Sequence, residues 1–260
     1  MMKTSAETLP PICETNVTRR IRSKLDICAK NGELTLVFGE TGRGKTLTAR
    51  HWCRENPRAV YLELRAASTL GSFIRQLCRA LTGGAKGPLA EVRERVDRFL
   101  SDNDVVLIID EAHQLLLSSD RDTLIRNIEY IRLDLYEHTG TPVALIFTED
   151  DDKTFNGSSL RGYLEQFLGR GLNQLKIPPR IFGTSEVTPI VGMFQPNPSP
   201  ELIRDAITVA GGVGKIRGLV KHLNTLRKMV DAKPDKYAFT GSRLLEIQDR
   251  FENGGKWEED

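Results

Sequence analysis

The sequence predicts an α/β fold, in which helices flank a parallel sheet, followed by a small domain built of helices alone. Near-continuous apolar segments recur along the first part of the chain and are separated by stretches with helical periodicity. Such segments are typical of strands that are buried on both faces of a parallel sheet and joined by right-handed crossovers. After the proline-rich segment at 194–200 no strand pattern is found. At 260 residues the chain can hold one large domain and a small addition.

The expected elements of the first part follow in chain order. Residues 1–15 are polar and contain adjacent prolines, so we expect a flexible lead-in. Apolar residues that recur every four positions predict a helix over 17–29. Strands are expected at 34–38, 59–64, 105–110 and 143–148. A fifth strand is expected around 175–177, and the prolines beside it require an edge position or a loop.

The last part of the chain predicts three helices, near 200–210, 214–231 and 240–252. Ser199 has the character of an N-cap, and Pro200 suits the first helical position. We therefore expect an α/β core over 16–193, a helical domain over 194–253 and an acidic tail over 254–260.

Composition limits the class of protein. The net charge is +2, from 37 basic and 35 acidic residues, so charge alone does not indicate a nucleic-acid binder. The four cysteines lie far apart without a C-x-x-C pair, which gives no zinc site or disulfide framework. No apolar run is long enough to cross a bilayer, and no secretory signal is present. We expect a soluble cytoplasmic protein that makes no contact with a membrane.

The segment GETGRGKT, residues 39–46, matches the phosphate-loop pattern G-x-x-x-x-G-K-[ST] between an expected strand and an expected helix. Its backbone N–H groups would bind phosphate oxygens, Lys45 would contact the β- and γ-phosphates, and the Thr46 hydroxyl would ligate Mg²⁺. The alternative is a solvated glycine-rich turn, which the strand before it and the helix after it argue against. The expected cofactors are ATP and Mg²⁺, and the expected binding residues are Gly39, Glu40, Thr41, Gly42, Arg43, Gly44, Lys45, Thr46 and Leu47.

The apolar segment VVLIIDEAH ends in two carboxylates. Asp110, at the end of the expected strand, is placed to hold Mg²⁺ through water, and Glu111 is suited to act as general base on the attacking water. The alternative is an Asp-Glu pair that only caps a following helix. Since a phosphate loop precedes it, we favour the catalytic interpretation. His113 follows, and a single histidine without a partner is better explained as structural.

A phosphate loop, a strand that ends in Asp-Glu and a trailing helical domain together resemble the AAA+ ATPases. The resemblance implies a P-loop AAA+ core with a C-terminal helical lid. Thr148, at the end of VALIFT, matches the polar sensor 1 residue of that family. In GKIR, residues 214–217, Arg217 matches the sensor 2 arginine, although it also fits an ordinary amphipathic helix. For an arginine that acts on a neighbouring subunit our choice is Arg170, with Arg161 and Arg180 as rivals.

Within that family, residues 16–232 resemble the B-type ATPases of transposing phages (MuB) and their transposon relatives (TnsC). The similarity lies in the short helix before the phosphate strand, in the tyrosine-bearing strand AVYLEL, in the leucine-rich helix after it and in DEAHQL. The sequence before residue 16 is too short for the N-terminal DNA-binding appendage of the phage protein. We therefore expect DNA binding to come from the ATPase core.

The resemblance implies an ATPase that assembles on double-stranded DNA when ATP is bound, marks a target site there and recruits or stimulates a transposase or another recombination protein. It also implies a homo-oligomer, either a ring or a helical filament with about six subunits per turn. Such binding needs basic residues that contact phosphates without regard to base sequence. The candidates are Arg65, Arg75, Arg79 and Lys86, which equally fit a solvated helix face.

Other classes of function remain open at this point. The chain could be a helicase loader, which binds single-stranded DNA and a replicative helicase. It could also be an ATP-controlled switch for protein assembly, in secretion or phage defence, that does not act on DNA. A metabolic kinase would use the same loop, but the DEAH segment and the helical domain argue against it. Stimulation of ATP hydrolysis by duplex DNA separates the first function from the others.

Overall fold

The computed structural model describes residues 9–65, 69–116, 121–148, 173–178, 182–212 and 214–254. Contacts between residues divide the chain into two compact units. The first unit comprises Met1–Ile12, Arg20–Thr41 and Lys45–Ile177, and the second comprises Cys13–Arg19, Gly42–Gly44 and Pro178–Asp260. The first unit contains the sheet, and the second contains only helices among its described elements.

The sheet has five parallel strands in the order β2-β3-β4-β1-β5. Their bounds are β1 Leu34–Phe38, β2 Ala59–Glu63, β3 Val106–Asp110, β4 Val143–Phe147 and β5 Asn173–Lys176. Strands β1, β3 and β4 are buried at every position, as expected for strands covered on both faces. Strand β5 lies at an edge, and it ends before Pro178, so the proline does not interrupt the hydrogen-bonded ladder. The predicted fold class is confirmed.

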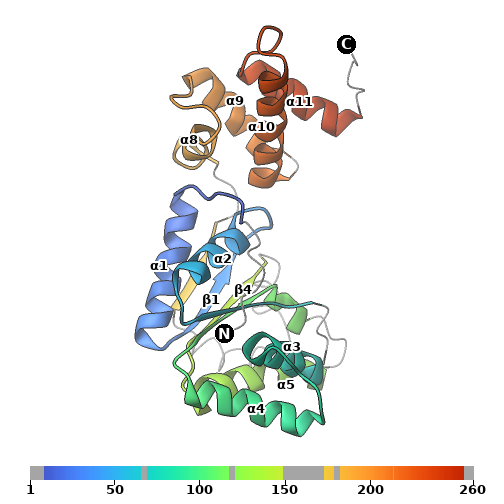
Figure 1. The fold of residues 1–260 in the computed structure, drawn as a ribbon. Helices are drawn as coiled ribbons and strands as arrows, with labels where there is room; N and C mark the ends of the chain where they lie inside the picture. Colours follow the sequence, from blue (N-terminus) through green and yellow to red (C-terminus); the bar gives the residue numbers. More distant parts are fainter. Residues whose placement is uncertain are drawn as a thin grey trace. The chain divides into compact units, whose positions relative to one another are not determined.

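Helices cover both faces of this sheet (Figure 1). Helices α1 and α2 lie on one side, and α3, α4 and α5 lie on the other. Their bounds are α1 Asn16–Asn31, α2 Lys45–Glu55, α3 Leu70–Thr82, α4 Leu89–Asp102 and α5 Arg121–Glu129, with a 3₁₀ turn η1 at Ala112–Leu115 and a π-helical segment η2 at Tyr130–His138. The sequence pattern did not indicate the π-helical segment.

Alternate residues of each strand point to the same face of the sheet, and those that point toward α3, α4 and α5 form the core on that side. Leu34, Leu36 and Phe38 of β1 point to this side and pack with buried residues of α3, α4 and α5. The rings of Phe38 and Phe147 stack with their centroids 5.1 Å apart. Because these rings end β1 and β4, the apolar core extends to the carboxyl edge of the sheet.

Polar contacts join the elements on the other side. The indole nitrogen of Trp52 on α2 donates a 2.7 Å hydrogen bond to Asp26 Oδ1 on α1. The amide of Asn173 on β5 donates to Thr35 Oγ1 on β1 at 2.8 Å and to the Lys24 carbonyl on α1. These bonds satisfy polar groups that the packing of α1 and α2 buries.

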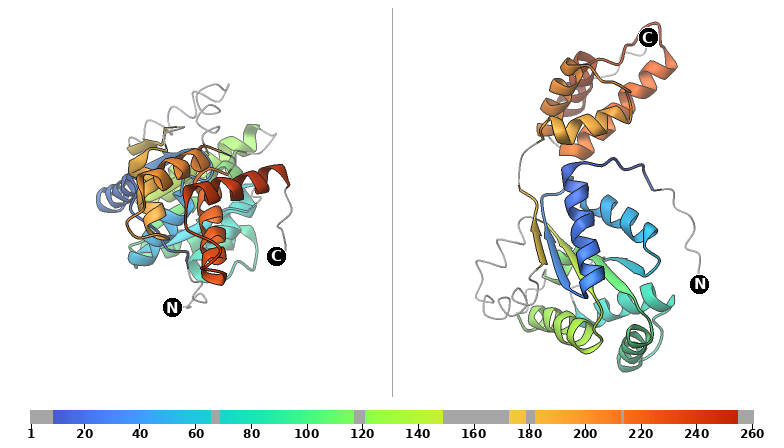
Figure 2. Two further views of the ribbon diagram at one scale, coloured as in Figure 1. Left: turned by 90° about the horizontal axis from the view of Figure 1, so that it is seen from above. Right: turned by 90° about the vertical axis from the view of Figure 1, so that its left-hand side faces the viewer.

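The second unit contains α8 Thr184–Gly192, α9 Pro200–Gly211, α10 Lys215–Ala232 and α11 Gly241–Asn253. The Ser199 hydroxyl accepts a hydrogen bond from the Leu202 amide at 3.2 Å, and Pro200 is the first helical residue, as predicted. Figure 2 shows these helices packed together. Apolar residues of all four form one core. Helix α8 packs against α9 within this unit, and Pro178–Asp260 is the longest of its segments.

No helix in the described part of the chain combines the length and apolar character needed to span a membrane.

Candidate nucleotide site

The topology brings three predicted segments to one edge of the sheet. Strand β4 lies between β1 and β3, and its Phe147 pairs in register with Phe38 of β1. The carboxyl ends of parallel strands meet at the same edge. The phosphate loop after β1, Thr148 after β4 and the Asp110-Glu111 pair at the end of β3 therefore lie side by side. Ligands of open α/β sheets bind at this edge.

The loop after β1 has the backbone that a phosphate requires. Gly42 and Gly44 have φ angles of +82° and +83°, in the region that favours glycine, and helix α2 begins at Lys45. Beside Gly44 the space that a Cβ atom would occupy is open to a distance of 4 Å. The helix N-terminus adds its partial positive charge to the loop amides. The loop therefore fits an anion.

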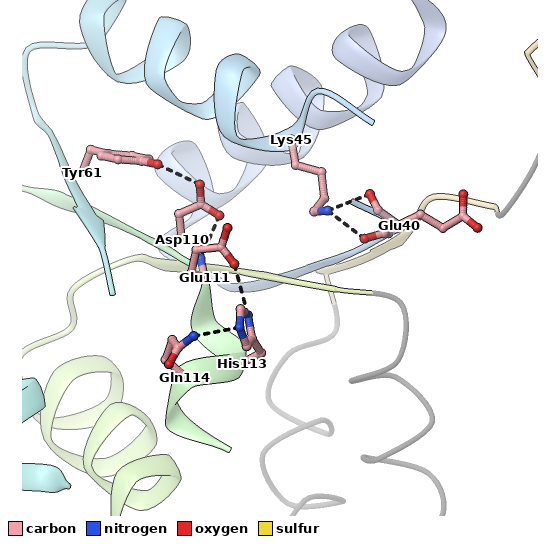
Figure 3. Close-up of polar contacts among 8 residues, drawn as sticks. Glu40, Lys45, Tyr61, Asp110, Glu111, His113 and Gln114 are labelled. Atoms are coloured by element: carbon pink, nitrogen blue, oxygen red, sulfur yellow. Dashed lines mark hydrogen bonds and ion pairs between the residues drawn. The ribbon is translucent and has the colours of Figure 1, made fainter. Parts of the chain in front are cut away.

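Lys45 is held over this loop by main-chain carbonyls. Its Nζ donates hydrogen bonds to the Gly39 carbonyl at 2.7 Å and to the Glu40 carbonyl at 3.0 Å (Figure 3). The side chain is only 8% exposed. A buried ammonium beside this loop favours the binding of an anion such as a triphosphate.

Asp110 is buried, and each of its carboxylate oxygens accepts a hydrogen bond. The Tyr61 hydroxyl donates to Oδ2 at 2.7 Å, and the Glu111 amide donates to Oδ1 at 2.8 Å (Figure 3). Burial and the nearby Asp110 charge raise the pKa of the Tyr61 phenol. Burial, with a smaller contribution from Asp110, raises the pKa of the Cys53 thiol to about 12. Both groups therefore stay neutral beside the Asp110 carboxylate.

Glu111 lies in a strained backbone conformation at the start of η1. Its φ and ψ angles are 53° and 36°, a left-handed geometry that is uncommon for a residue with a side chain. Its Oε2 lies 3.2 Å from Nδ1 of His113, and the Gln114 amide nitrogen lies 2.9 Å from Nε2 of the same ring (Figure 3). Backbone strain of this kind concentrates at functional sites. His113 thus has a partner, which the sequence analysis did not foresee.

The donor set fits Mg²⁺. This ion prefers oxygen ligands and is commonly held by one or two carboxylates together with substrate phosphates. The Thr46 hydroxyl on α2 and the Asp110 carboxylate on β3 are such donors, and both follow directly from the motifs. Within the described ranges there is no group of three or more His, Cys, Asp or Glu residues that could hold a metal by themselves. The site therefore suits an ion that arrives with a phosphate ligand.

The other predicted residues of the nucleotide site lie in different parts of the chain. Thr148 is half-buried and follows β4 directly, between the loop and Asp110. Arg43 is buried within the second unit, where its guanidinium lies 4.6 Å from the Phe182 ring centroid and donates to the Pro178 carbonyl. Arg217 is exposed in the first turn of α10, so its role as sensor 2 stays a prediction. The three candidates for the trans-acting arginine, Arg170, Arg161 and Arg180, lie outside the described residues.

The four candidates for DNA contact lie on and around α3. Arg65, Arg79 and Lys86 are exposed. Arg75 is half-buried, and its Nη1 donates to the Ala85 carbonyl at 2.8 Å, so part of its guanidinium holds the loop after α3. The first three are therefore free of that structural task and are the better candidates for phosphate contact.

Residues 29–155 match the family model described as AAA domain. This range includes the phosphate loop, Asp110 and Glu111. The fold is the P-loop AAA+ fold. No curated protein matches the sequence.

Solved structures of AAA+ proteins resemble the chain over most of its length. The ORC1 protein of Aeropyrum pernix in complex with DNA has a TM-score of 0.66 and 18% identity, over 95% of this chain and 68% of that one. Drosophila ORC bound to DNA has a TM-score of 0.64 and 15% identity, over 96% and 64%. AMPPCP-bound DnaA from Aquifex aeolicus has a TM-score of 0.57 and 17% identity, over 95% and 72%. At these identities the similarity concerns the fold.

The sequence motifs did not point to Tyr61 and Arg50. Tyr61 contacts Asp110, and Arg50 lies 5.4 Å from the Tyr61 ring centroid. Neither belongs to a short motif, because they come from α2 and β2 and meet only in the folded sheet. The one signal in the sequence was a tyrosine within the mostly apolar segment AVYLEL.

Proposed function

We propose that this AAA+ protein binds ATP with Mg²⁺ and hydrolyses it to ADP and phosphate. The observation that carries the proposal is the juxtaposition, at one sheet edge, of a phosphate loop with its lysine and a buried Asp110 followed by Glu111. A structural role for either segment alone would not require the other beside it.

In this proposal each residue has a defined task. The loop amides and Lys45 hold the phosphate oxygens, while Thr46 and Asp110 hold the metal ion. When bound, Mg²⁺ neutralises charge on the phosphate oxygens. The Glu111 carboxylate orients a water and takes its proton, and Thr148 donates a hydrogen bond toward the phosphate.

ATP binding would control association with DNA. Support comes from the fold relatives, two of which were solved with DNA and one with an ATP analogue. The net charge of +2 cannot attract DNA over the whole surface, so binding needs a local basic patch that an oligomer repeats. Arg65, Arg79 and Lys86 provide exposed positive charge near α3 for such a patch.

The finer proposal is that the protein assembles as a ring or filament on duplex DNA and delivers that DNA to a transposase. It rests on the resemblance of residues 16–232 to the B-type transposition ATPases. The second candidate is a role in replication, as an initiator or helicase loader. It is favoured by the similarity in fold to ORC and DnaA proteins.

The test is ATP hydrolysis by the purified protein, measured alone, with duplex DNA and with single-stranded DNA. Stimulation by duplexes of unrelated sequence, with DNA-bound oligomers seen by electron microscopy only when ATP is present, would support the transposition proposal. Stimulation by single strands alone would favour the helicase loader. Hydrolysis that no nucleic acid changes would favour the protein-assembly switch. Absence of hydrolysis under all three conditions would refute the ATPase proposal.

A further inference from the structure

Tyr61 is the central member of a polar chain that leads to Asp110. Its hydroxyl donates to Asp110 Oδ2 at 2.7 Å, and the Arg50 guanidinium lies 5.4 Å from its ring centroid. Arg50 also pairs with Glu63. The exposed fraction of the side chain is 33% for Arg50 and 44% for Glu63, whereas Asp110 is 2% exposed. The chain thus runs from the surface to the buried carboxylate.

These residues come together because of their spacing along helix α2 and along strand β2. On helix α2, positions 46, 50 and 53 recur at intervals of four and three, which places Thr46, Arg50 and Cys53 on one face. On strand β2, Tyr61 and Glu63 are two residues apart and point to the same face. Glu63 pairs in register with Asp110 on β3. The face of α2 that carries Thr46 is therefore also the face that meets β2 beside Asp110.

The two protein ligands proposed for Mg²⁺ stand on separate elements, with Thr46 on α2 and Asp110 on β3. Arg50 connects α2 to β2 through its contacts with Glu63 and Tyr61. Tyr61 connects β2 to Asp110. The chain of contacts thus joins both halves of the site. It leaves the Thr46 hydroxyl oxygen and the remaining lone pairs of the Asp110 carboxylate for the metal.

We propose that Tyr61 is a positioning residue for Asp110 and that Arg50 holds Tyr61 in place, so that the Thr46 and Asp110 oxygens stay at the separation that Mg²⁺ requires. This inference rests on the proposed ATPase function. Partners of this kind orient a metal ligand and commonly contribute about 10- to 100-fold to metal affinity or activity.

The chemistry of the surroundings favours orientation over any direct role for Tyr61. Its hydroxyl donates to Asp110 Oδ2 and therefore acts as a hydrogen-bond donor to the carboxylate. The contact with Tyr61 raises the pKa of Arg50, which stays a cation. The neutral Cys53 thiol adds no competing charge on the same face. Without the hydrogen bond from the Tyr61 phenol, the Asp110 carboxylate could rotate about its side-chain torsions.

The test compares Tyr61→Phe with the wild type by Mg²⁺ titration of a fluorescent N-methylanthraniloyl derivative of ATP. Affinity for the nucleotide is first measured with EDTA and should be unchanged, because Lys45 and the loop amides are intact. The Mg²⁺ concentration that gives half of the cation-dependent signal should rise by about tenfold. Paramagnetic resonance of Mn²⁺, with the nucleotide present, gives the same comparison without any turnover.

Tyr130→Phe is the matched control, because it removes another buried tyrosine hydroxyl of the first unit, one that makes no hydrogen bond to the described residues. It should titrate like the wild type. A half-saturation for Tyr61→Phe equal to that of Tyr130→Phe would overturn the proposal. Circular dichroism checks folding. If Tyr61→Phe does not fold, Arg50→Gln keeps the hydroxyl, removes the cation beside the ring and should raise the half-saturation in the same direction.

The control arms separate this inference from the function it rests on. If the wild type binds no nucleotide with Mg²⁺, the ATPase proposal fails. If the wild type binds it, and Tyr61→Phe and Arg50→Gln both titrate normally, the ATPase proposal stands and only the positioning role is wrong.

Discussion

Nδ1 of His113 lies 3.2 Å from Oε2 of Glu111, and Glu111 itself has a left-handed backbone. The contact holds the proposed general base beside an imidazole within the same turn. A carboxylate oxygen that is engaged in this way is a weaker base and is less free to orient a water.

We therefore expect His113→Ala to raise the basal rate of ATP hydrolysis by up to about fivefold, since a partly exposed contact between charged groups contributes at most about 1 kcal/mol. Nucleotide affinity should not change. The measurement is steady-state phosphate release under saturating ATP, with His138→Ala, an exposed histidine on η2, as control. A fall in the rate would instead mean that His113 orients Glu111 for catalysis.

Lys45 and Glu111 are expected to act at different steps. Lys45→Ala should weaken ATP binding by about 10- to 100-fold, because a hydrogen bond to a charged group contributes about 1.5–3 kcal/mol. Glu111→Gln should keep ATP affinity and lower hydrolysis by about 100-fold or more, because the proton acceptor is lost. Equilibrium binding and single-turnover hydrolysis separate the two. Normal hydrolysis by Glu111→Gln would show that another group is the base.

An arginine supplied by a neighbouring subunit should reveal itself in mixed oligomers. We expect Arg170→Ala to bind ATP normally and to hydrolyse it slowly. Mixed with Glu111→Gln, which keeps its arginine, it should recover part of the activity at interfaces that join an intact site to an intact arginine. Mixtures as inactive as their parents would count against Arg170 and direct the same experiment to Arg161 and Arg180.

The exposed basic residues near α3 should contribute to DNA affinity. The double change Arg79→Glu and Lys86→Glu should weaken duplex binding in ATP and lower the slope of log affinity against log salt by about two, or about one for each lost phosphate contact. Nucleotide binding should be unaffected. Lys30→Glu with Arg54→Glu, which reverses two exposed charges in the last turns of α1 and α2, is the control. Equal losses in both double variants would indicate a general charge effect.

The pH dependence of stability should report on His222 in the second unit. Burial lowers the pKa of His222 below the ordinary value of 6.5, and the nearby positive charge of Lys221 lowers it further. The unfolded chain then binds the proton more readily, so stability is lost as the pH falls below the ordinary value.

From pH 7.5 to 5.5 the wild type should lose more unfolding free energy than His222→Gln, by no more than about 1.4 kcal/mol, since the lower pH is about one unit below the ordinary value. Denaturant unfolding at both pH values measures this difference. An identical loss in both proteins would mean that His222 titrates normally.

The local sequence pattern was enough to predict the elements that have a clear apolar pattern or a clear helix cap. The strand at 34–38 was predicted with its observed bounds, because five residues that are apolar except for Thr35 stand directly before a glycine loop. The helix that begins after Ser199 was also predicted, since a side-chain cap and a proline act within a single turn. The π-helical segment at Tyr130–His138 was missed, because the sequence carries no period for it.

The sequence by itself determined which residues are the candidates for holding a phosphate and a metal ion. The glycines at 42 and 44 and the lysine after them lie in one short segment, and Asp110 and Glu111 lie at the end of one strand. Only the tertiary structure decided what these groups contact. The pairing of Tyr61 with Asp110 depends on β2 lying beside β3, and the position of Thr148 depends on β4 lying between β1 and β3. Strand order is set by long-range packing of the whole sheet, which no short segment encodes.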